Sequence, residues 1–361
     1  MAATRACDAP LQLFAPESPT VTHNKQEPFM NRFLDLADFP REQVKDLLGL
    51  ASRLQQHPQP QALAGKVLGL LFLNPSLRTL ASFQSAIMRL GGTAVVITPG
   101  QGTWQMETRV GAVMNGAAAE HVREAVPVLA SYCDAIGIRM FAEHRNLETD
   151  LAETGFNMMA KLCDKPLVNM ESAASHPCQA LADWHTLDEL RVPERGKFVL
   201  SWANHPRALP LAVPASTVHM AAMRGMDVVV LRPDGFALPE QIMNKARQAA
   251  ASSGGAVHET SDRQEALKGA HVVYAKEWGS PQHYGDAEAE TQLRESVKGW
   301  CVQDDWFRAT DPACHFMHCL PVRRNVAVAD EVLDGPRSVV IREAFNRMVV
   351  QMAVLYRLLR G

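Results

Sequence analysis

The chain has 361 residues, of which 47% are hydrophobic and 21% charged, and its formal net charge is −3. This length predicts about two domains, each large enough for its own core, and the composition is that of a globular protein. No basic stripe is present to bind nucleic acid, and no apolar run approaches the roughly 20 residues that cross a bilayer, so we expect neither partner.

Residues 1–29 differ from the rest of the chain because they hold four prolines and show no sustained period. They lack the apolar core of a signal peptide and the Arg-rich bias of a transit peptide, so we interpret them as a flexible tail. Met30 opens the first helical pattern, whose apolar residues run from Phe33 to Leu48.

From residue 67 onward, strand-like and helical patterns alternate, which predicts an α/β fold of mostly parallel sheets flanked by helices. The predicted strands are 67–73, 93–97, 134–139, 166–170, 197–202, 227–232, 271–275, 314–318 and 338–341. The predicted helices are 79–90, 120–131, 147–163, 177–190, 209–223, 239–252 and 343–359. The stretch 190–196 interrupts the helical pattern before a new strand begins. We therefore place the domain boundary in the helix before this stretch. We predict two doubly wound domains, 30–180 and 181–342.

A short polar cluster, Asn74-Pro75-Ser76-Leu77-Arg78-Thr79, stands between the first predicted strand and the helix after it. A helix N-terminus offers unsatisfied amide donors and partial positive charge, which favour a phosphate. Ser76 and Thr79 add hydroxyl groups, and Arg78 adds a forked cation. The alternative is an N-cap serine beside a surface arginine.

Two further clusters, His176-Pro177-Cys178-Gln179 and His318-Cys319-Leu320-Pro321, also follow strand-like runs. Ligands of open α/β sheets bind beyond the carboxyl ends of strands. Polar residues fall at or just after such ends at Ser76, Arg139, Glu171, His176, His205, Lys276 and Cys319. We therefore predict one anion site in the cleft between the two domains.

Other readings of these clusters are weaker. Pro60 stands where a phosphate-binding loop would need its first glycine, and no Gly-x-Gly-x-x-Gly follows a strand, which excludes kinases and dehydrogenases. Cys314-His315-x-x-His318-Cys319 resembles a zinc cluster only superficially, because strand residues alternate faces and no second ligand pair has a usual spacing. We expect no metal.

The three clusters resemble motifs of the aspartate/ornithine carbamoyltransferase family, whose members move the carbamoyl group of carbamoyl phosphate to an amine. The family's Ser-x-Arg-Thr-Arg is matched at 76–79 but departs at Leu80, its His-Pro-x-Gln is matched at 176–179, and its His-Cys-Leu-Pro at 318–321. The resemblance covers roughly residues 30–361. It implies that the C-terminal helix, 343–361, packs back on the first domain.

The resemblance also implies a reaction that uses no cofactor and depends on positioning, oxyanion stabilisation and phosphate neutralisation. It gives catalytic roles to Thr79, Arg139 and His176. The carbamoyl-phosphate contacts that it implies are Ser76, Leu77, Arg78, Thr79, Trp104, Arg139, His176, Pro177, Cys178, Gln179, Cys319, Leu320 and Arg347. Trp104 matches a residue that reaches the neighbouring subunit's site, so a homotrimer with shared active sites is expected. The alternative for Trp104 is a surface plug.

The identity of the amine depends on Lys276, which stands where enzymes for free ornithine have an aspartate that binds the α-ammonium. A lysine suits a substrate whose α-nitrogen is acylated. The chain resembles the branch that acts on N-acetyl- or N-succinyl-L-ornithine, which implies acyl-ornithine contacts at Glu171, His205, Lys276, Cys319, Leu320 and Arg323.

Two alanines favour the succinyl form of the substrate. Ala119 and Ala327 stand where the acetyl pattern has a glutamate and a lysine, and loss of an anion removes repulsion against a second carboxylate. We expect N-succinyl-L-ornithine and carbamoyl phosphate to give N-succinyl-L-citrulline and phosphate, in arginine biosynthesis. The alternatives are the acetyl-specific enzyme, an ordinary ornithine enzyme and an inactive homologue kept for binding. Seven cysteines, odd in number and without framework spacing, favour a cytoplasmic protein.

Overall fold

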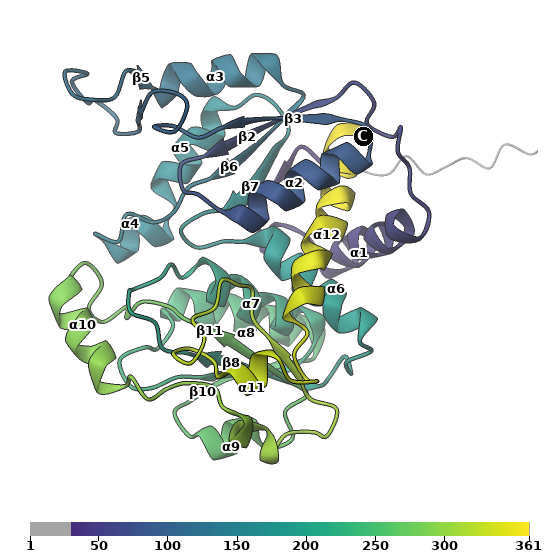
Figure 1. Cartoon of the computed structure of the whole chain (residues 1–361), viewed down its shortest axis with the longest axis vertical. Coiled ribbons are helices and arrows are strands. Elements are labelled where there is room, and N and C mark those ends of the chain that lie inside the picture. Colours follow the sequence, from purple (N-terminus) through teal and green to yellow (C-terminus); the bar gives the residue numbers. More distant parts are fainter. Residues whose placement is uncertain (1–29, 361) are drawn as a thin grey trace, which may run out of the picture.

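A computed structural model describes residues 30–360, which form two α/β domains, one above the other in Figure 1. Each domain holds a five-stranded, fully parallel sheet with helices on its faces, which confirms the predicted fold class. The interpretation of residues 1–29 as a tail lies outside the described residues. The predicted division at residue 180 falls within a single helix and stays a prediction.

The sheet of the first domain has the order β1-β7-β6-β2-β3. Its strands are β1 (Arg32–Phe33), β2 (Val67–Phe72), β3 (Thr93–Ile97), β6 (Ala135–Arg139) and β7 (Leu167–Glu171). β2, β6 and β7 are adjacent and almost fully buried, as expected of parallel strands covered on both faces. A two-stranded sheet of β4 (Met106–Glu107) and β5 (Glu120–His121) lies at one side of this domain (Figure 1).

Helices surround this sheet on both faces (Figure 1). They are η1 (Leu36–Asp38), α1 (Arg41–Gln56), α2 (Leu77–Arg89), α3 (Val122–Tyr132), α4 (Leu147–Leu151), α5 (Thr154–Leu162) and α6 (Pro177–Glu189). α6 is buried along most of its length because it lies between the two domains and contacts α7 and α12.

The sheet of the second domain has the order β10-β9-β8-β11-β12. Its strands are β8 (Lys197–Trp202), β9 (Asp227–Leu231), β10 (Ala256–Thr260), β11 (Val272–Lys276) and β12 (His315–Met317). The helices are α7 (Ala212–Arg224), α8 (Glu240–Ser253), α9 (Arg263–Leu267), α10 (Ala287–Ser296), η2 (Asp304–Arg308) and α11 (Asp330–Leu333). Within residues 30–360, no helix is long and apolar enough to span a membrane.

The last helix, α12 (Val340–Arg360), begins beside β12 and packs on α1, α2 and α6 of the first domain (Figure 1). One buried cluster runs through both domains, with Phe83 of α2, Leu355 of α12 and Leu200 of β8 among its members. Hydrophobic contact across the domain boundary makes α12 part of the first domain's core.

Several predicted elements were wrong in type or bounds. The predicted strand 338–341 is not a strand: Ser338 makes only an isolated bridge to Phe316, and α12 begins at Val340. The pattern from Met30, predicted as one helix, begins with the short strand β1 and the 3-10 helix η1, and α1 starts only at Arg41, directly after Pro40. The edge strand β10 and the short helices α9 and α10 were missed. The predicted helix 147–163 is split at Glu153, whose φ of +52° is left-handed.

Candidate active site

A cavity of about 640 Å³ lies between the two domains, at the carboxyl ends of both sheets. Three adjacent strands of the first sheet, β2, β6 and β7, lead to Ser76, Arg139 and Glu171. Three adjacent strands of the second, β8, β11 and β12, lead to His205, Lys276 and Cys319. The predicted site residues that line this cavity are Ser76, Leu77, Arg78, Arg139, Glu171, His176, Gln179, His205, Lys276, Cys319, Leu320, Arg323 and Arg347.

One end of the cavity is the N-terminus of α2. Ser76 is the N-cap residue, and its Oγ accepts from the backbone N of Thr79 at 3.3 Å. Nη2 of Arg347 donates to Oγ1 of Thr79 at 2.7 Å, which ties α12 to this turn. Thr79 is fully buried and lies behind the cavity wall, whereas Arg78 and Arg347 line it. The combination of free amides, hydroxyls and guanidinium groups is suited to a phosphate.

The centre of the cavity is held by Glu171, which forms an ion pair with Arg139. Oε2 of Glu171 also lies 3.3 Å from Nε2 of His176. Burial lowers the pKa of His176 well below its usual value, and the charges of Arg347 and Arg139 lower it further, so the imidazole is neutral. The Arg139 guanidinium lies 4.5 Å from the centre of the Phe141 ring, which fixes its plane.

The second domain contributes a buried charge network. Nζ of Lys276 lies 2.9 Å from Oε2 of Glu277, and Nε2 of His318 lies 3.3 Å from the same oxygen. Burial acts to lower the pKa of Lys276, but the charge and hydrogen bond of Glu277 together with other nearby groups such as Glu171 outweigh it, and the pKa is raised. Burial acts to raise the pKa of Glu277, yet Lys276 and His318 lower it well below its usual range. Lys276 therefore presents a permanent cation to the cavity.

Cys319 and Leu320 follow β12 on a turn fixed from within. The backbone N of Leu320 donates to Nδ1 of His318 at 2.9 Å, and Leu320 has a left-handed φ of +57°. Burial raises the pKa of the Cys319 thiol to about 12, so the sulfur is not a thiolate near neutral pH. This turn can therefore contact a substrate through its backbone rather than through a reactive thiolate.

Arg323 and His205 lie together at the mouth of the cavity. Nε of Arg323 is 3.4 Å from Nε2 of His205, and Arg323 is exposed. Burial lowers the pKa of His205, so the arginine is the cation of this pair. The side chains that line the cavity include one carboxylate, that of Glu171, and five cations, which are Arg78, Arg139, Lys276, Arg323 and Arg347. Such an excess of cations favours a dianionic ligand.

Four predicted site residues lie away from the cavity besides Thr79. Pro177 and Cys178 are buried in the first turn of α6 behind His176. Trp104 is 56% exposed on the β4 side of the first domain, where its Nε1 donates to Glu120 at 2.7 Å. Ala119 is exposed nearby, and its backbone N donates to the carbonyl of Gln105. Neither Trp104 nor Ala119 lines the cavity of its own chain.

Sequence reasoning missed several lining residues. Apolar side chains at Phe141, Leu209, Pro210, Val213 and Val322 complete the wall. Phe141 stands two residues after the predicted strand 134–139, so its position was a usable signal. The apolar residues at the start of α7 carried no such signal because they read as core.

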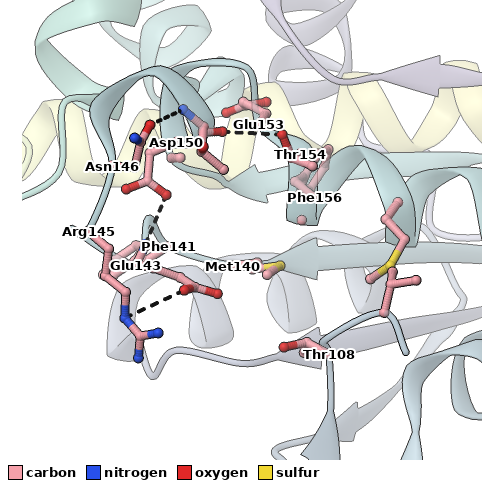
Figure 2. Close-up of a pocket in the computed structure, with 15 residues that line it drawn as sticks. Thr108, Met140, Phe141, Glu143, Arg145, Asn146, Asp150, Glu153, Thr154 and Phe156 are labelled. Carbon is pink, nitrogen blue, oxygen red and sulfur yellow. Dashed lines mark hydrogen bonds and ion pairs between the residues drawn. The ribbon is translucent and has the colours of Figure 1, made fainter. Parts of the chain in front are cut away.

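A second hollow, of about 360 Å³, shares Phe141 with the main cavity (Figure 2). Glu143 and Arg145 lie at one rim, 3.8 Å apart. Asp150 accepts from Tyr284 of the second domain at 2.7 Å, which links the two domains here. Within residues 30–360, no group of three or more His, Cys, Asp or Glu side chains is arranged to hold a metal ion.

Family models match most of the chain. The carbamoyl-P binding domain of aspartate/ornithine carbamoyltransferase matches residues 31–189, and the Asp/Orn binding domain of the same family matches residues 212–358. N-acetylornithine carbamoyltransferase of Xanthomonas campestris is 38% identical over 330 residues, which are 90% of this chain and 97% of the relative. N-succinylornithine carbamoyltransferase of Bacteroides thetaiotaomicron is also 38% identical, over 82% of this chain and 88% of the relative.

Solved structures agree with these matches. Acetylornithine transcarbamylase complexed with acetylcitrulline superposes with a TM-score of 0.87 at 37% identity, over 91% of this chain and 99% of that one. A variant of N-acetyl-L-ornithine transcarbamylase in which a glutamate is replaced by serine, complexed with carbamyl phosphate and N-succinyl-L-norvaline, also has a TM-score of 0.87. It is 38% identical and covers 91% and 100% of the two chains.

Proposed function

The chain belongs to the aspartate/ornithine carbamoyltransferase family, and we propose that it transfers the carbamoyl group of carbamoyl phosphate to the δ-amine of N-succinyl-L-ornithine. The observation that carries this proposal is the cation of Lys276, buried at the end of β11 and held charged by Glu277. Lys276 would repel a free α-ammonium group. In an acylated ornithine the α-nitrogen is a neutral amide, and the lysine attracts the neighbouring carboxylate.

Carbamoyl phosphate binds with its phosphate at the N-terminus of α2. Ser76, the amides from Leu77 onward and the guanidinium groups of Arg78 and Arg347 hold the phosphate oxygens. Thr79 supports this cradle from behind, since its hydroxyl is bonded to Ser76 and Arg347. With the phosphate fixed, the carbamoyl group points toward Arg139 and His176.

The reaction is attack of the neutral δ-amine on the carbamoyl carbon. The N–C bond forms, the C–O bond to phosphate breaks, and the proton of the amine leaves with the phosphate as hydrogen phosphate. Arg139 stabilises the charge that develops on the carbonyl oxygen, and the neutral imidazole of His176 does so through its single N–H, which lies against Glu171 before substrate binds. The backbone carbonyls of Cys319 and Leu320 accept from the carbamoyl and attacking nitrogens, while Gln179 holds the carbamoyl nitrogen. Glu171 and Lys276 hold the acylated amino acid.

The succinyl group is favoured by charge at the outer end of the cavity. Arg323, next to His205, can pair with a second carboxylate that an acetyl group lacks. Ala119 brings no anion where the acetyl pattern has a glutamate, and Ala327 is a buried core residue where that pattern has a lysine. A related enzyme altered at a glutamate was solved with N-succinyl-L-norvaline, which is consistent with this reasoning.

The second candidate is transfer to N-acetyl-L-ornithine. The equal identity to an acetyl- and a succinyl-ornithine enzyme favours neither. The choice therefore rests on Arg323 and the two alanines.

The direct test is carbamoyl transfer with ornithine, N-acetyl-L-ornithine and N-succinyl-L-ornithine as separate acceptors. We expect the highest kcat/KM with the succinyl compound and negligible transfer to free ornithine. A preference for acetylornithine would establish the second candidate. Absence of transfer to all three amines would leave a binding homologue.

We also propose that Trp104 and Ala119 act in the site of a neighbouring subunit, within a homotrimer. Both lie outside their own cavity, and the segment between them carries exposed apolar side chains at Val110, Val113 and Met114. A surface of this kind is typical of a subunit contact.

A further inference from the structure

The side-chain amide of Gln179 is held by two buried carboxyl groups. Its Nε2 donates to Oδ1 of Asp183 at 2.8 Å and to Oε1 of Glu343 at 3.0 Å. Asp183 lies one turn further along α6, whereas Glu343 comes from α12, 164 residues away in sequence. Both amide hydrogens of Gln179 are therefore directed away from the cavity and into the protein.

The two carboxyl groups are fully buried, and both accept from the same amide nitrogen. Tyr274 donates to Oε1 of Glu343 at 3.2 Å, and the backbone N of His318 donates to Oε2 at 2.9 Å. Burial raises the pKa of both Asp183 and Glu343, and the charge of Asp183 raises that of Glu343 further. Two like charges in such a place do not both ionise near neutral pH, so at most one of the two carboxyl groups is ionised there.

This arrangement decides which way the amide faces. An ionised carboxylate only accepts hydrogen bonds, so the nitrogen of Gln179 must turn toward the pair and the oxygen away from it. Gln179 also lines the cavity, and its Oε1 is buried without a partner among the described residues. The amide therefore presents an acceptor, and no donor, to a ligand in the cavity.

We infer that the Asp183–Glu343 pair is a positioning device that locks the Gln179 amide with its oxygen toward the substrate, so that the site selects a ligand carrying an NH2 group. This inference rests on the proposed function, in which carbamoyl phosphate fills the cavity. Acetyl phosphate has nearly the same shape but a methyl group in place of the NH2 group. It would leave Oε1 of Gln179 buried and unpaired, which is unfavourable.

The test measures the dissociation constants of carbamoyl phosphate and acetyl phosphate by calorimetry. The wild-type protein should bind carbamoyl phosphate about tenfold or more tightly than acetyl phosphate, as expected for one unsatisfied buried acceptor. Asp183→Asn or Glu343→Gln alone should change this ratio little, because the remaining carboxyl group ionises and still holds the amide nitrogen.

The double variant Asp183→Asn/Glu343→Gln is the informative one. With no carboxylate left, the new amides can donate to the oxygen of Gln179 and let the group turn round. We expect its preference for carbamoyl phosphate to fall about tenfold, with acetyl phosphate bound as before. In a Gln179→Met background, the same double substitution should change neither affinity. Asp188→Asn, on the outer part of α6, serves as the matched control.

The outcomes separate the two ideas. If the double variant folds, as its thermal unfolding would show, and keeps the wild-type preference, the pair does not position Gln179. Equal weakening of both ligands would mean that the pair only supports the structure, which also overturns the inference. If the wild-type protein binds carbamoyl phosphate but transfers it to no amine, only the proposed acceptor fails. No binding at all would overturn both.

Discussion

Oε2 of Glu171 lies 3.3 Å from Nε2 of His176, so one carboxylate at the end of β7 orients the imidazole at the start of α6. The same carboxylate is paired with Arg139 at the end of β6. The two groups assigned to the carbonyl oxygen are therefore held in place by a shared anion before any substrate arrives. Arg139 keeps further N–H groups for the carbonyl oxygen, whereas His176 must turn its single N–H from Glu171 toward it.

Removing either group should abolish most of the turnover. We expect Arg139→Ala and His176→Ala each to lower kcat by about 10²-fold or more, because each supports the developing oxyanion. Circular dichroism should show an intact fold. Arg89→Ala and His258→Ala, on exposed surfaces away from the cavity, are the matched controls. Near-normal kcat in both active-site variants would contradict the assignment.

Introducing an anion at position 119 should lower kcat/KM for the succinyl substrate much more than for the acetyl substrate. At an effective dielectric constant near 20, two like charges about 4 Å apart repel by roughly 4 kcal/mol before relaxation. Ala119→Glu should lower kcat/KM for N-succinyl-L-ornithine by about one to three powers of ten, with far less loss for N-acetyl-L-ornithine. Ala117→Glu, in the same exposed segment, controls for charge alone. Equal losses on both substrates would mean that position 119 does not face the acyl group.

The Lys276–Glu277 pair should make a single substitution costly for stability. Lys276→Met leaves the buried carboxylate of Glu277 without its nearest cation, so we expect the free energy of unfolding to fall by about 3 kcal/mol. Adding Glu277→Gln should recover much of this loss, without recovering transfer to acyl-ornithine. Urea unfolding measures the first effect and steady-state kinetics the second. If the double variant is no more stable than Lys276→Met, the ion pair is not the cause.

His219 should make stability depend on pH. It is buried in α7, and burial lowers its pKa from about 6.5 to about 4. Between these values the unfolded chain binds a proton that the native chain does not, so stability is lost as the pH falls from about 6.5 to 4. At 1.36 kcal/mol per pH unit, this one group accounts for about 3 kcal/mol. Urea unfolding of His219→Gln at pH 7 and pH 5 should show a smaller loss than wild type, whereas an unchanged loss would assign the effect to other histidines.

Shared active sites predict complementation between inactive chains. Trp104→Ala and His176→Ala should each be inactive alone. After unfolding and refolding together in equal amounts, about a quarter of the sites in randomly mixed trimers would combine an intact cavity with an intact neighbouring Trp104. Regained activity of this size, with a trimeric mass in sedimentation, supports the proposal. A mixture as inactive as its components would place Trp104 in its own chain's site or in none.

The positions of Ser76, Arg139, Glu171 and Lys276 could be predicted from the sequence because parallel strands align their carboxyl ends at one edge. Once the parallel strands are recognised, the residues that follow them are expected at the same edge of each sheet. The structure brings them together in one cavity as expected.

Other features depend on contacts between distant segments, which local patterns do not carry. Val339, Val340 and Ile341 have strand propensity, but the packing of the following residues on α1, α2 and α6 makes this stretch enter a helix. The meeting of Asp183 and Glu343 could not be read from the sequence either, because it exists only after α12 has crossed to α6.

The crossing of α12 has a consequence for how the chain is made on the ribosome. The first domain is synthesised first, yet part of its core and Arg347, which donates to Thr79 beside the cavity, belong to the last 21-residue helix. Domains otherwise tend to fold in order of synthesis. Here the N-terminal half leaves the ribosome with the face of α1 and α2 uncovered. Its hydrophobic core is completed only after α12 has been synthesised. A nonsense codon anywhere before Val340 would thus leave the first domain incomplete as well as the second.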